Sequence, residues 1–309
     1  MKIEATKTYK SIFFESPRWR EFEMRPDDIV VATPYKAGTT WTQNIVLHLI
    51  HQDLVQRDIW AISPWLEMAF DPWDKVKETL DPQTHRRVIK SHLAFDGLHF
   101  DTEAKYIFVC RDPRDIFMSM WTFYTNFGEE MFAKPEGSDH PPLPRPPETI
   151  QDFWDIWIAR GQFEGETDGY PFWSVFHQIA TWWNERHRDN VLFVHYANLL
   201  SDSQAEIARI AEFLGIEVSD DMIDKIAEIT SFKSMKKNAD KIEPKSNLKG
   251  GAAAFFHKGT NGRWDGVLRP DQLAQYDRVA DQKLEPACRT WAETGRGGDF
   301  SVPQRAGLD

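Results

Sequence analysis

Residues 29–41 read Ile29-Val30-Val31-Ala32-Thr33-Pro34-Tyr35-Lys36-Ala37-Gly38-Thr39-Thr40-Trp41, and this stretch decides the fold. Its first four residues form an apolar run typical of a buried parallel strand. A tight turn follows, and a helical pattern begins near Thr39. Backbone N–H groups are free at such a helix start, and the helix dipole makes that end positive. Because the ammonium of Lys36 and the hydroxyls of Thr39 and Thr40 lie beside them, the stretch predicts a site for a phosphate or sulfate group.

The lysine of this turn is not placed as in the triphosphate-binding loop of P-loop proteins. That loop has the pattern Gly-x-x-x-x-Gly-Lys-Ser/Thr, in which the lysine directly follows the second glycine. Here Lys36 comes two residues before Gly38, and no glycine occupies the first position of the pattern. A Walker-type kinase is therefore disfavoured. A plain strand-to-helix turn with a chance lysine stays open on this segment alone.

Composition excludes several classes of protein. The 309 residues are 41% hydrophobic and no linker or charge tract divides them, so we expect one globular domain over residues 1–309. A net charge of −11 disfavours a general nucleic-acid binder, so an anion site must come from a local basic cluster. No apolar run has membrane-spanning length, and no membrane contact is expected. Cys110 and Cys288 lack metal-ligand spacing and indicate reduced thiols in a cytoplasmic protein without a metal.

Strand and helix patterns alternate along the chain. Apolar runs predict buried parallel strands at 29–32, 87–90, 106–110 and 191–195. Helical patterns fit about 39–51, 114–123, 174–188, 203–214, 220–229 and 270–290. This alternation predicts an α/β fold with a central parallel sheet covered by helices on both faces. Ligands of such sheets bind at the carboxyl ends of the strands.

Two segments predict irregular loops. Residues 131–147 contain six prolines and cannot form a regular element. A plain connector and a lid over a substrate mouth both fit this segment. Residues 161–170, rich in glycine and acidic residues, are open to the same two interpretations.

Further polar residues follow the predicted strands. Arg111 follows strand 106–110, and Ser119 in the next helix reaches the same anion only if that helix leans across the site. Alone, Arg111 is equally well explained as a salt-bridge partner of Asp112 or Asp115. Strand 87–90 ends in Lys90-Ser91-His92.

His92 is a candidate general base. An imidazole with a pKa near neutrality can take a proton from a substrate hydroxyl, although a lone histidine is more often structural. Its place at a strand end favours catalysis. Residues 255–264 combine basic residues with two glycines and fit either a loop that closes on a phosphate or a charged surface turn.

Five segments together resemble, in order and spacing, the signature segments of the cytosolic sulfotransferases. They are Lys36-Ala37-Gly38-Thr39-Thr40-Trp41, Lys90-Ser91-His92, Arg111-Asp112-Pro113-Arg114-Asp115 with Ser119, Thr230-Ser231-Phe232-Lys233-Ser234-Met235, and Lys258-Gly259-Thr260-Asn261-Gly262-Arg263-Trp264. The resemblance covers about residues 28–270 and leaves a C-terminal helix and tail over 271–309.

The resemblance implies transfer of a sulfuryl group from 3′-phosphoadenosine 5′-phosphosulfate (PAPS) to a hydroxyl or amine, with the 3′,5′-bisphosphate (PAP) as product and no metal. The turn residues Lys36, Ala37, Gly38, Thr39 and Thr40 are then expected to hold the 5′-phosphosulfate. The 3′-phosphate is expected at Arg111, Ser119, His257, Lys258 and Gly259. The adenine is expected between Trp41 and Phe232, with Tyr196 and Thr230 near its edge, and Met235 is also expected to contact the cofactor.

The same resemblance assigns catalytic roles. His92 is expected to deprotonate the acceptor, Lys36 to stabilise the leaving oxygen, and Lys90 to contact the sulfuryl oxygens. Ser119 is expected to restrain the turn lysine until acceptor arrives. Sulfuryl transfer is an in-line displacement in which charge grows on the leaving oxygen, so a cation there stabilises the transition state.

The chain departs from the family at several positions. His257 stands where arginine is usual, and Pro34-Tyr35 reverses the common order. The family's dimerisation segment usually carries Lys, Thr-Val and Glu, and here Asp265, Arg269-Pro270 and Ala274 stand at those places. That dimer is therefore not expected, and the oligomeric state is open.

The expected partner is a small acceptor, a phenol, alcohol or amine, with an apolar or aromatic body. Phe123 is a candidate contact for it. A P-loop kinase-like phosphotransferase is an alternative, although an obvious magnesium carboxylate is missing. A catalytically silent nucleotide-binding protein is another, against which Lys36, Lys90 and His92 argue.

Overall fold

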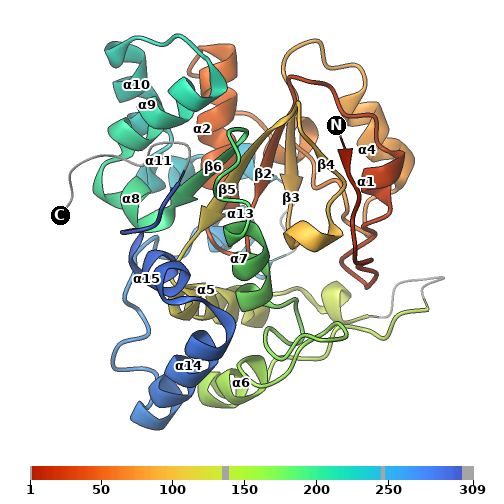
Figure 1. Ribbon diagram of the computed structural model, residues 1–309, viewed down its shortest axis with the longest axis vertical. Coiled ribbons are helices and arrows are strands. Elements are labelled where there is room, and N and C mark those ends of the chain that lie inside the picture. Colours follow the sequence, from red (N-terminus) through yellow and green to blue (C-terminus); the bar gives the residue numbers. More distant parts are fainter. Residues whose placement is uncertain (1, 134–138, 245–247, 301–309) are drawn as a thin grey trace.

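A parallel sheet of four strands occupies the centre of the molecule (Figure 1). The computed structural model describes residues 2–133, 139–244 and 248–300. The strands lie in the order β3-β2-β5-β6. They are β2 (Ile29–Ala32), β3 (Val88–Ser91), β5 (Lys105–Cys110) and β6 (Val191–His195). The four predicted strands and their parallel pairing are thereby confirmed.

Each strand faces two hydrophobic cores, because successive side chains of a strand point to opposite faces. In β5, Tyr106, Phe108 and Cys110 belong to one core, whereas Ile107 and Val109 belong to the other. The residues of β2 and β6 divide in the same way. A parallel sheet buried on both faces needs helices on both sides, which the observed layers provide.

Long helices form the two outer layers. One core includes residues of α2 (Thr39–His51), α9 (Ser203–Leu214) and α10 (Asp220–Ile229). The other includes residues of α5 (Pro113–Thr125), α6 (Ile150–Trp157), α7 (Val175–Trp183), α14 (Pro270–Lys283) and α15 (Pro286–Thr294). Figure 1 shows α9 and α10 beside α2, and α5, α14 and α15 away from them. Within the described ranges, no helix has the length and apolar character of a membrane span.

Short elements complete the chain. They are β1 (Lys2–Ile3), β4 (Phe100–Asp101), α1 (Arg18–Glu21), α3 (Ile59–Ile62), α4 (Trp73–Leu80), α8 (Tyr196–Ser201), α11 (Phe232–Lys237), α12 (Ala239–Ile242), α13 (Ala252–Phe255) and the 3₁₀ turns η1 (Phe95–Gly97) and η2 (Glu129–Phe132). The strands β1 and β4 pair antiparallel in a separate small sheet. The sequence patterns missed these elements because most are too short to show a period.

The expectation of one helix over 270–290 is wrong. Two helices, α14 and α15, are separated at Leu284 and Glu285, whose backbones are extended. Pro286 has no N–H, and its ring disfavours a helical conformation of the residue before it, so the helix ends and a new one begins. Helix α7 is also shorter than predicted, because it ends at Trp183 and not at residue 188.

The described part of the proline-rich segment 131–147 is irregular except at η2, as predicted. Leu143 is buried, and the hydroxyl of Tyr124 donates a hydrogen bond to the carbonyl of Pro144. The part at 134–138, which contains Pro135, lies outside the described residues. Residues 143–144 are therefore held against the core, and Pro144 is bonded to α5.

The second predicted loop, 161–170, packs on the N-terminal segment. The carbonyl of Glu164 accepts a hydrogen bond from Lys7 Nζ at 3.0 Å, and the ring of Phe163 lies 4.9 Å from that of Tyr9. These contacts hold the loop beside the N-terminal segment.

Candidate active site

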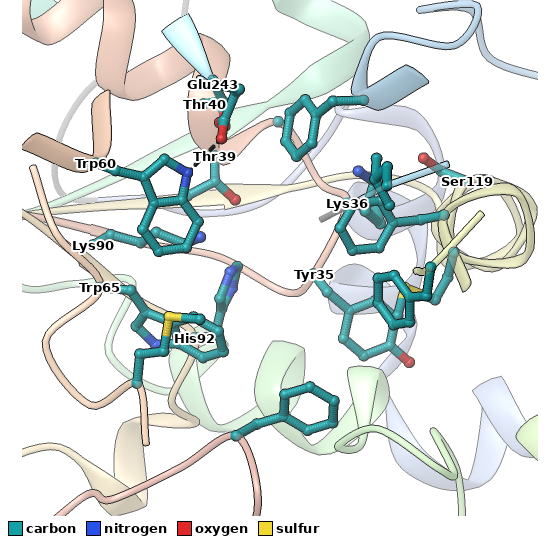
Figure 2. Close-up of a pocket in the computed structure, with 18 of the residues that line it drawn as sticks. Tyr35, Lys36, Thr39, Thr40, Trp60, Trp65, Lys90, His92, Ser119 and Glu243 are labelled. Carbon is teal, nitrogen blue, oxygen red and sulfur yellow. Dashed lines mark hydrogen bonds between the residues drawn. The ribbon is translucent and has the colours of Figure 1, made fainter. Parts of the chain in front are cut away.

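The carboxyl ends of the four parallel strands deliver side chains to one cavity of about 980 Å³. Lys36 follows β2, His92 follows β3, Arg111 follows β5 and Tyr196 follows β6. Figure 2 shows Lys90 and His92 on one side of this cavity and Lys36 and Ser119 on the other. The sheet edge thus brings together residues that are far apart in sequence, as expected for a parallel sheet.

Most of the predicted site residues line this cavity. They are Lys36, Gly38, Thr39, Thr40, Trp41, Lys90, His92, Arg111, Ser119, Phe123, Tyr196, Phe232, Met235, His257, Lys258 and Gly259. Met131 and Ala133 of the proline-rich segment line it as well.

Two predicted residues are not part of the wall. The side chain of Ala37 is fully buried in the turn. Thr230 is fully buried, and its hydroxyl donates to the carbonyl of Ile226 at 2.7 Å. The Thr230 hydroxyl thus bonds to the last turn of α10 and does not face the cavity.

The turn before α2 has the backbone geometry of an anion cradle. Lys36 and Gly38 both have positive φ, 59° and 113°. Gly38 caps α2 without a side-chain hydrogen bond, so the first N–H groups of the helix are left for a ligand. A Cβ at position 38 would lie 3.0 Å from the ring of Tyr196, so only glycine fits here without strain.

The ammonium of Lys36 lies between two aromatic rings. Its Nζ is 3.9 Å from the ring centre of Phe123 and 4.2 Å from that of Phe255. Burial lowers the pKa of Lys36 to about 7; the charges of Lys90 and Arg111 act in the same direction, and Glu243 opposes them. Phe123 therefore contacts the turn lysine itself, which the sequence did not indicate.

His92 is held as a neutral imidazole with a defined tautomer. Its Nδ1 lies 2.7 Å from the carbonyl oxygen of Thr33, so Nδ1 carries the proton and Nε2 carries the lone pair. The ring is 4.7 Å from that of Trp65 and 5.4 Å from that of Trp173. Burial holds the pKa of His92 well below its usual value, and the charge of Lys90 acts in the same direction. At neutral pH the imidazole can accept a proton.

A buried carboxylate supports this strand end. Glu67 accepts hydrogen bonds from the backbone N–H of His92 at 2.7 Å and from the hydroxyl of Ser91 at 3.1 Å. The indole N–H groups of Trp19 and Trp65 also donate to it, at 2.8 and 2.5 Å. These bonds fix the backbone that carries His92.

The basic residue of this edge is Lys90. Its Nζ lies 5.0 Å from the ring centre of Trp60 and 4.9 Å from that of Trp65. Burial lowers the pKa of Lys90, and Glu243 and Glu67 oppose that shift. Lys90 is thus placed beside His92 on an aromatic wall.

Arg111 is joined to the loop 258–264. Its Nε donates to Asn261 Oδ1 at 3.0 Å, and one terminal nitrogen donates to the carbonyl of Thr260 at 2.7 Å. The guanidinium lies 4.3 Å from the ring centre of Tyr196. The alternative that Arg111 pairs with Asp112 or Asp115 does not hold.

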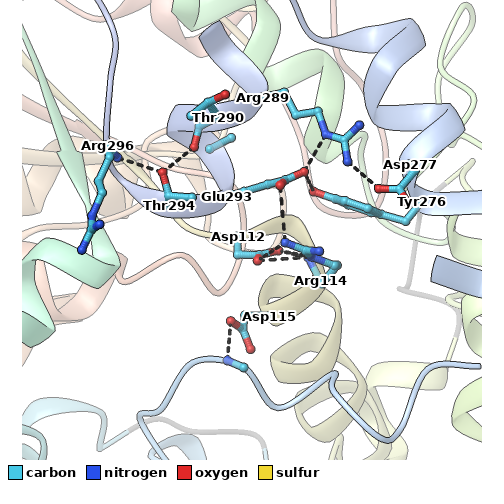
Figure 3. Close-up of polar contacts among 12 residues, drawn as sticks. Asp112, Arg114, Asp115, Tyr276, Asp277, Arg289, Thr290, Glu293, Thr294 and Arg296 are labelled. Carbon is cyan, nitrogen blue, oxygen red and sulfur yellow. Dashed lines mark hydrogen bonds and ion pairs between the residues drawn. The ribbon is translucent and has the colours of Figure 1, made fainter. Parts of the chain in front are cut away.

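Those two carboxylates have other partners (Figure 3). Asp112 caps α5 and pairs with Arg114 at 2.7 Å, and Arg114 also lies 3.6 Å from Glu293 of α15. Asp115 accepts the backbone N–H groups of Gly262 at 2.9 Å and Arg263 at 3.1 Å. Asp115 therefore positions the loop, Asp112 holds Arg114 at the start of α5, and Arg111 lines the cavity.

The aromatic end of the cavity is closely packed. Trp41 and Tyr196 meet edge to face at 5.4 Å. A Cβ at Gly259 would lie 2.4 Å from the ring of Phe232, so glycine at this position lets the loop approach that ring. At the mouth, His257 and Lys258 are exposed. Partial burial lowers the pKa of His257, and the charges of Arg263 and Lys258 lower it further.

Several cavity residues were absent from the sequence-based prediction. Trp60, Trp65 and Glu243 line the wall near Lys90, and Arg263 lines it near Arg111. Arg263 belongs to the last motif and was within reach of the sequence argument. The other three come from α3, from the turn after it and from the end of α12, where no periodic pattern marks them.

The sequence matches the family described as "Sulfotransferase domain" over residues 26–286. It is 30% identical to the glycolipid sulfotransferase of Mycobacterium bovis (strain BCG / Pasteur 1173P2), over 94% of this chain and 95% of that protein. The human sulfotransferase 1C2 is 28% identical over 86% of each chain.

Solved structures agree with these matches. The crystal structure of mouse sulfotransferase SULT7A1 complexed with PAP superposes with a TM-score of 0.71 at 24% identity, over 96% of this chain and 100% of that one. Retinol dehydratase in complex with androsterone and the inactive cofactor PAP gives a TM-score of 0.68 at 22% identity, over 88% and 84% of the chains. Since the family match spans most of the sequence and includes the strand ends that build the cavity, the chain belongs to the sulfotransferase family.

Proposed function

We propose that this enzyme transfers the sulfuryl group of PAPS to a hydroxyl of a small acceptor with an apolar body, and releases PAP. One observation carries the proposal. The same cavity holds an anion cradle at Lys36 and, across from it, the neutral imidazole of His92 with its lone pair on Nε2. Transfer from an anionic donor to a hydroxyl needs both an anion site and a base.

The residues of the cavity fit the donor. The turn before α2 supplies backbone N–H groups and the hydroxyl of Thr39 for the 5′-phosphosulfate, whereas the Thr40 hydroxyl donates to Glu243 at 2.9 Å. Arg111 and the exposed Lys258 suit the 3′-phosphate, and Ser119, which lines the same cavity, is a further candidate contact.

The aromatic end fits the adenine. Trp41 and Phe232 both line the wall, and ring faces of this kind stack on nucleobases. Trp41 also has a buried indole N–H without a partner among the described residues. A ring nitrogen of adenine is suited to accept a hydrogen bond from this N–H.

The chemistry follows from these positions. His92 Nε2 accepts the proton of the acceptor hydroxyl as its oxygen attacks sulfur, and the bond from sulfur to the bridging oxygen breaks. Lys36 stabilises the charge that grows on the leaving phosphate, and Lys90 stabilises the sulfuryl oxygens. Ser119 lies on the Lys36 side of the cavity, which supports the proposal that its hydroxyl restrains the lysine before acceptor binds.

The acceptor side of the cavity is apolar. Phe13, Met68, Phe127, Phe172 and Trp173 line it together with Trp65. The name of the mycobacterial relatives, glycolipid sulfotransferase, agrees with an acceptor that carries a large apolar part. We therefore favour alcohols and phenols with apolar bodies over small polar acceptors.

The decisive experiment is a PAPS-supported screen of alcohols, phenols and amines with product detection by mass, together with calorimetry of PAP binding. Sulfated product and PAP binding are expected. Magnesium-dependent turnover of ATP in place of PAPS turnover would establish the kinase alternative. Tight PAP binding without any sulfated product would establish the silent nucleotide-binding protein.

Asp115→Asn is expected to weaken PAP binding by about 10-fold while kcat at saturating PAPS stays close to that of the wild type. Asparagine keeps one acceptor oxygen and loses the charge that holds the amides of Gly262 and Arg263. Calorimetry of PAP binding measures the effect. Asp265→Asn, an exposed change in the same loop, is the control and should leave the dissociation constant unchanged. An Asp115→Asn variant with wild-type affinity would show that Asp115 does not tune the donor site.

A further inference from the structure

Glu243, the residue that follows α12, is a buried carboxylate in the wall of the cavity that holds the anion cradle. It is 4% exposed and lines the cavity beside Thr40 and Trp60 (Figure 2). The hydroxyl of Thr40 donates to Oε1 at 2.9 Å, and the indole N–H of Trp60 donates to Oε2 at 2.5 Å. Burial raises the pKa of Glu243, and the charges of Lys90 and Lys36 oppose that shift.

The contacts of Glu243 place it where donor and acceptor sites meet. Thr40 belongs to the anion cradle. The ring centre of Trp60 is 5.0 Å from Lys90 Nζ, and Lys90 belongs to β3, the strand that His92 follows. Glu243 and His92 line the same cavity with Lys90 between them, so an acceptor whose hydroxyl reaches His92 can extend past Lys90 toward Glu243 (Figure 2).

Glu243 has hydrogen-bonding capacity left for a ligand. An ionised carboxylate offers about four lone-pair sites, and the two bonds from Thr40 and Trp60 use two of them. An apolar acceptor that fills the cavity removes water from the other two, and the desolvation of a buried carboxylate is costly. A hydroxyl beside the reacting one replaces that water with a direct hydrogen bond.

The surrounding charges decide which kind of donor group suits Glu243. Lys36, Lys90 and Arg111 all line the same cavity. The charges that act on Glu243 itself are those of Lys90 and Lys36, so an ammonium group placed against Glu243 would lie close to two basic side chains that repel it. The remaining lone pairs of Glu243 are thus suited to neutral hydroxyls.

We propose that Glu243 is a specificity-determining residue that selects acceptors with a second hydroxyl next to the reacting one, as in a vicinal diol or a sugar ring. Trp60 and Trp65 supply the apolar walls against which such a ring packs. This inference rests on the proposed sulfuryl transfer and specifies the polar end of its acceptor.

The test compares 4-phenylcyclohexane-1,2-diol with 4-phenylcyclohexanol as acceptors at saturating PAPS. The wild type is expected to favour the diol by about 100-fold in kcat/KM, since a site that hydrogen-bonds a hydroxyl rejects the analogue without it. Glu243→Leu should reduce this ratio to about 3-fold or less, mainly by accelerating the mono-alcohol. Glu243→Gln retains one acceptor oxygen and should give an intermediate ratio.

The matched control is Glu78→Gln. Glu78 is an exposed carboxylate on the rim of the same cavity, and its replacement changes the charge equally without touching Thr40 or Trp60. The diol preference should remain at the wild-type value. Because kcat/KM for both acceptors is measured with the same variant, changes in donor affinity and in the amount of folded enzyme cancel in the ratio of the two values.

Several results would overturn the inference. An equal rate with both acceptors in the wild type, or an unchanged ratio in Glu243→Leu, removes the role of Glu243. The diol preference is ruled out if 2-amino-4-phenylcyclohexanol is sulfated faster than the diol. It is also ruled out if phenols are sulfated and neither cyclohexane acceptor is. A different result would rule out the proposed sulfuryl transfer itself, namely no sulfated product from any acceptor together with no binding of PAP.

Discussion

His92→Gln is expected to lower kcat by about 10²- to 10⁴-fold, the range found when a general base is removed, with PAP affinity nearly unchanged. Glutamine is close to histidine in size and can still donate to the carbonyl of Thr33, which His92 Nδ1 contacts at 2.7 Å. The variant lacks a basic nitrogen at the position of Nε2. Single-turnover kinetics with PAPS and a reactive alcohol measure the chemical step directly.

The pH profile separates a catalytic role of His92 from a structural one. Burial holds the pKa of the imidazole well below its usual value, so the neutral form prevails at and above neutral pH. The wild-type rate of the chemical step should therefore show no loss attributable to His92 between pH 6.5 and 8, and should decline in acid as the imidazole takes up a proton. His92→Gln should lack that acid decline.

His85→Gln is the control, because His85 lies outside the cavity wall and bonds to the carbonyl of Arg86. Its kcat should equal that of the wild type. A His92→Gln enzyme with more than half of the wild-type kcat would rule out His92 as the base. A lowered kcat with an unaltered acid decline would assign that decline to another group.

Lys36→Met is expected to lower kcat/KM for PAPS by about 10³-fold, the size of effect seen when one preorganised charge contact to a transition state is lost. The Nζ of Lys36 lies between the rings of Phe123 and Phe255 at the turn that cradles the anion. Methionine keeps the apolar stem that packs there and removes the charge. Steady-state kinetics and circular dichroism of the purified variant separate lost activity from lost fold.

Lys36 should also make donor binding depend on pH. Its pKa in the free protein is about 7, mainly because of burial. An anion bound beside it favours the charged form and raises the pKa, so binding takes up a proton above pH 7. Affinity for PAP should be greatest below pH 7 and fall by up to about 10-fold per pH unit above it, until the pKa of the bound state is reached.

Calorimetry in buffers of different ionisation enthalpy measures this proton uptake at pH 8. The wild type should take up close to one proton when PAP binds, and Lys36→Met should take up none at this site. Equal uptake by both proteins would assign the linkage to another group. Lys237→Met, which removes an exposed lysine outside the cavity wall, is the matched control and should keep the wild-type uptake.

The sequence by itself determined the parallel sheet and the anion cradle, because the patterns that mark strands and helix starts are local. Four apolar runs gave the parallel strands, and the helix start after Gly38 gave the anion cradle. Since parallel strands end at one edge of a sheet, the residues after them, Lys36, His92 and Arg111, had to meet. Their meeting at one edge needed only the positions of the strand ends, whereas the roles proposed for them came from the family resemblance.

Only the tertiary structure decided what surrounds those residues. The two rings that contact Lys36, Phe123 and Phe255, come from α5 and α13. Glu243 bonds to Thr40, which lies 203 positions earlier in the sequence. The tautomer of His92 depends on the carbonyl of Thr33, a contact between neighbouring strands. Burial, and with it every pKa shift of the site, arises from packing between distant segments, and no local pattern encodes that packing.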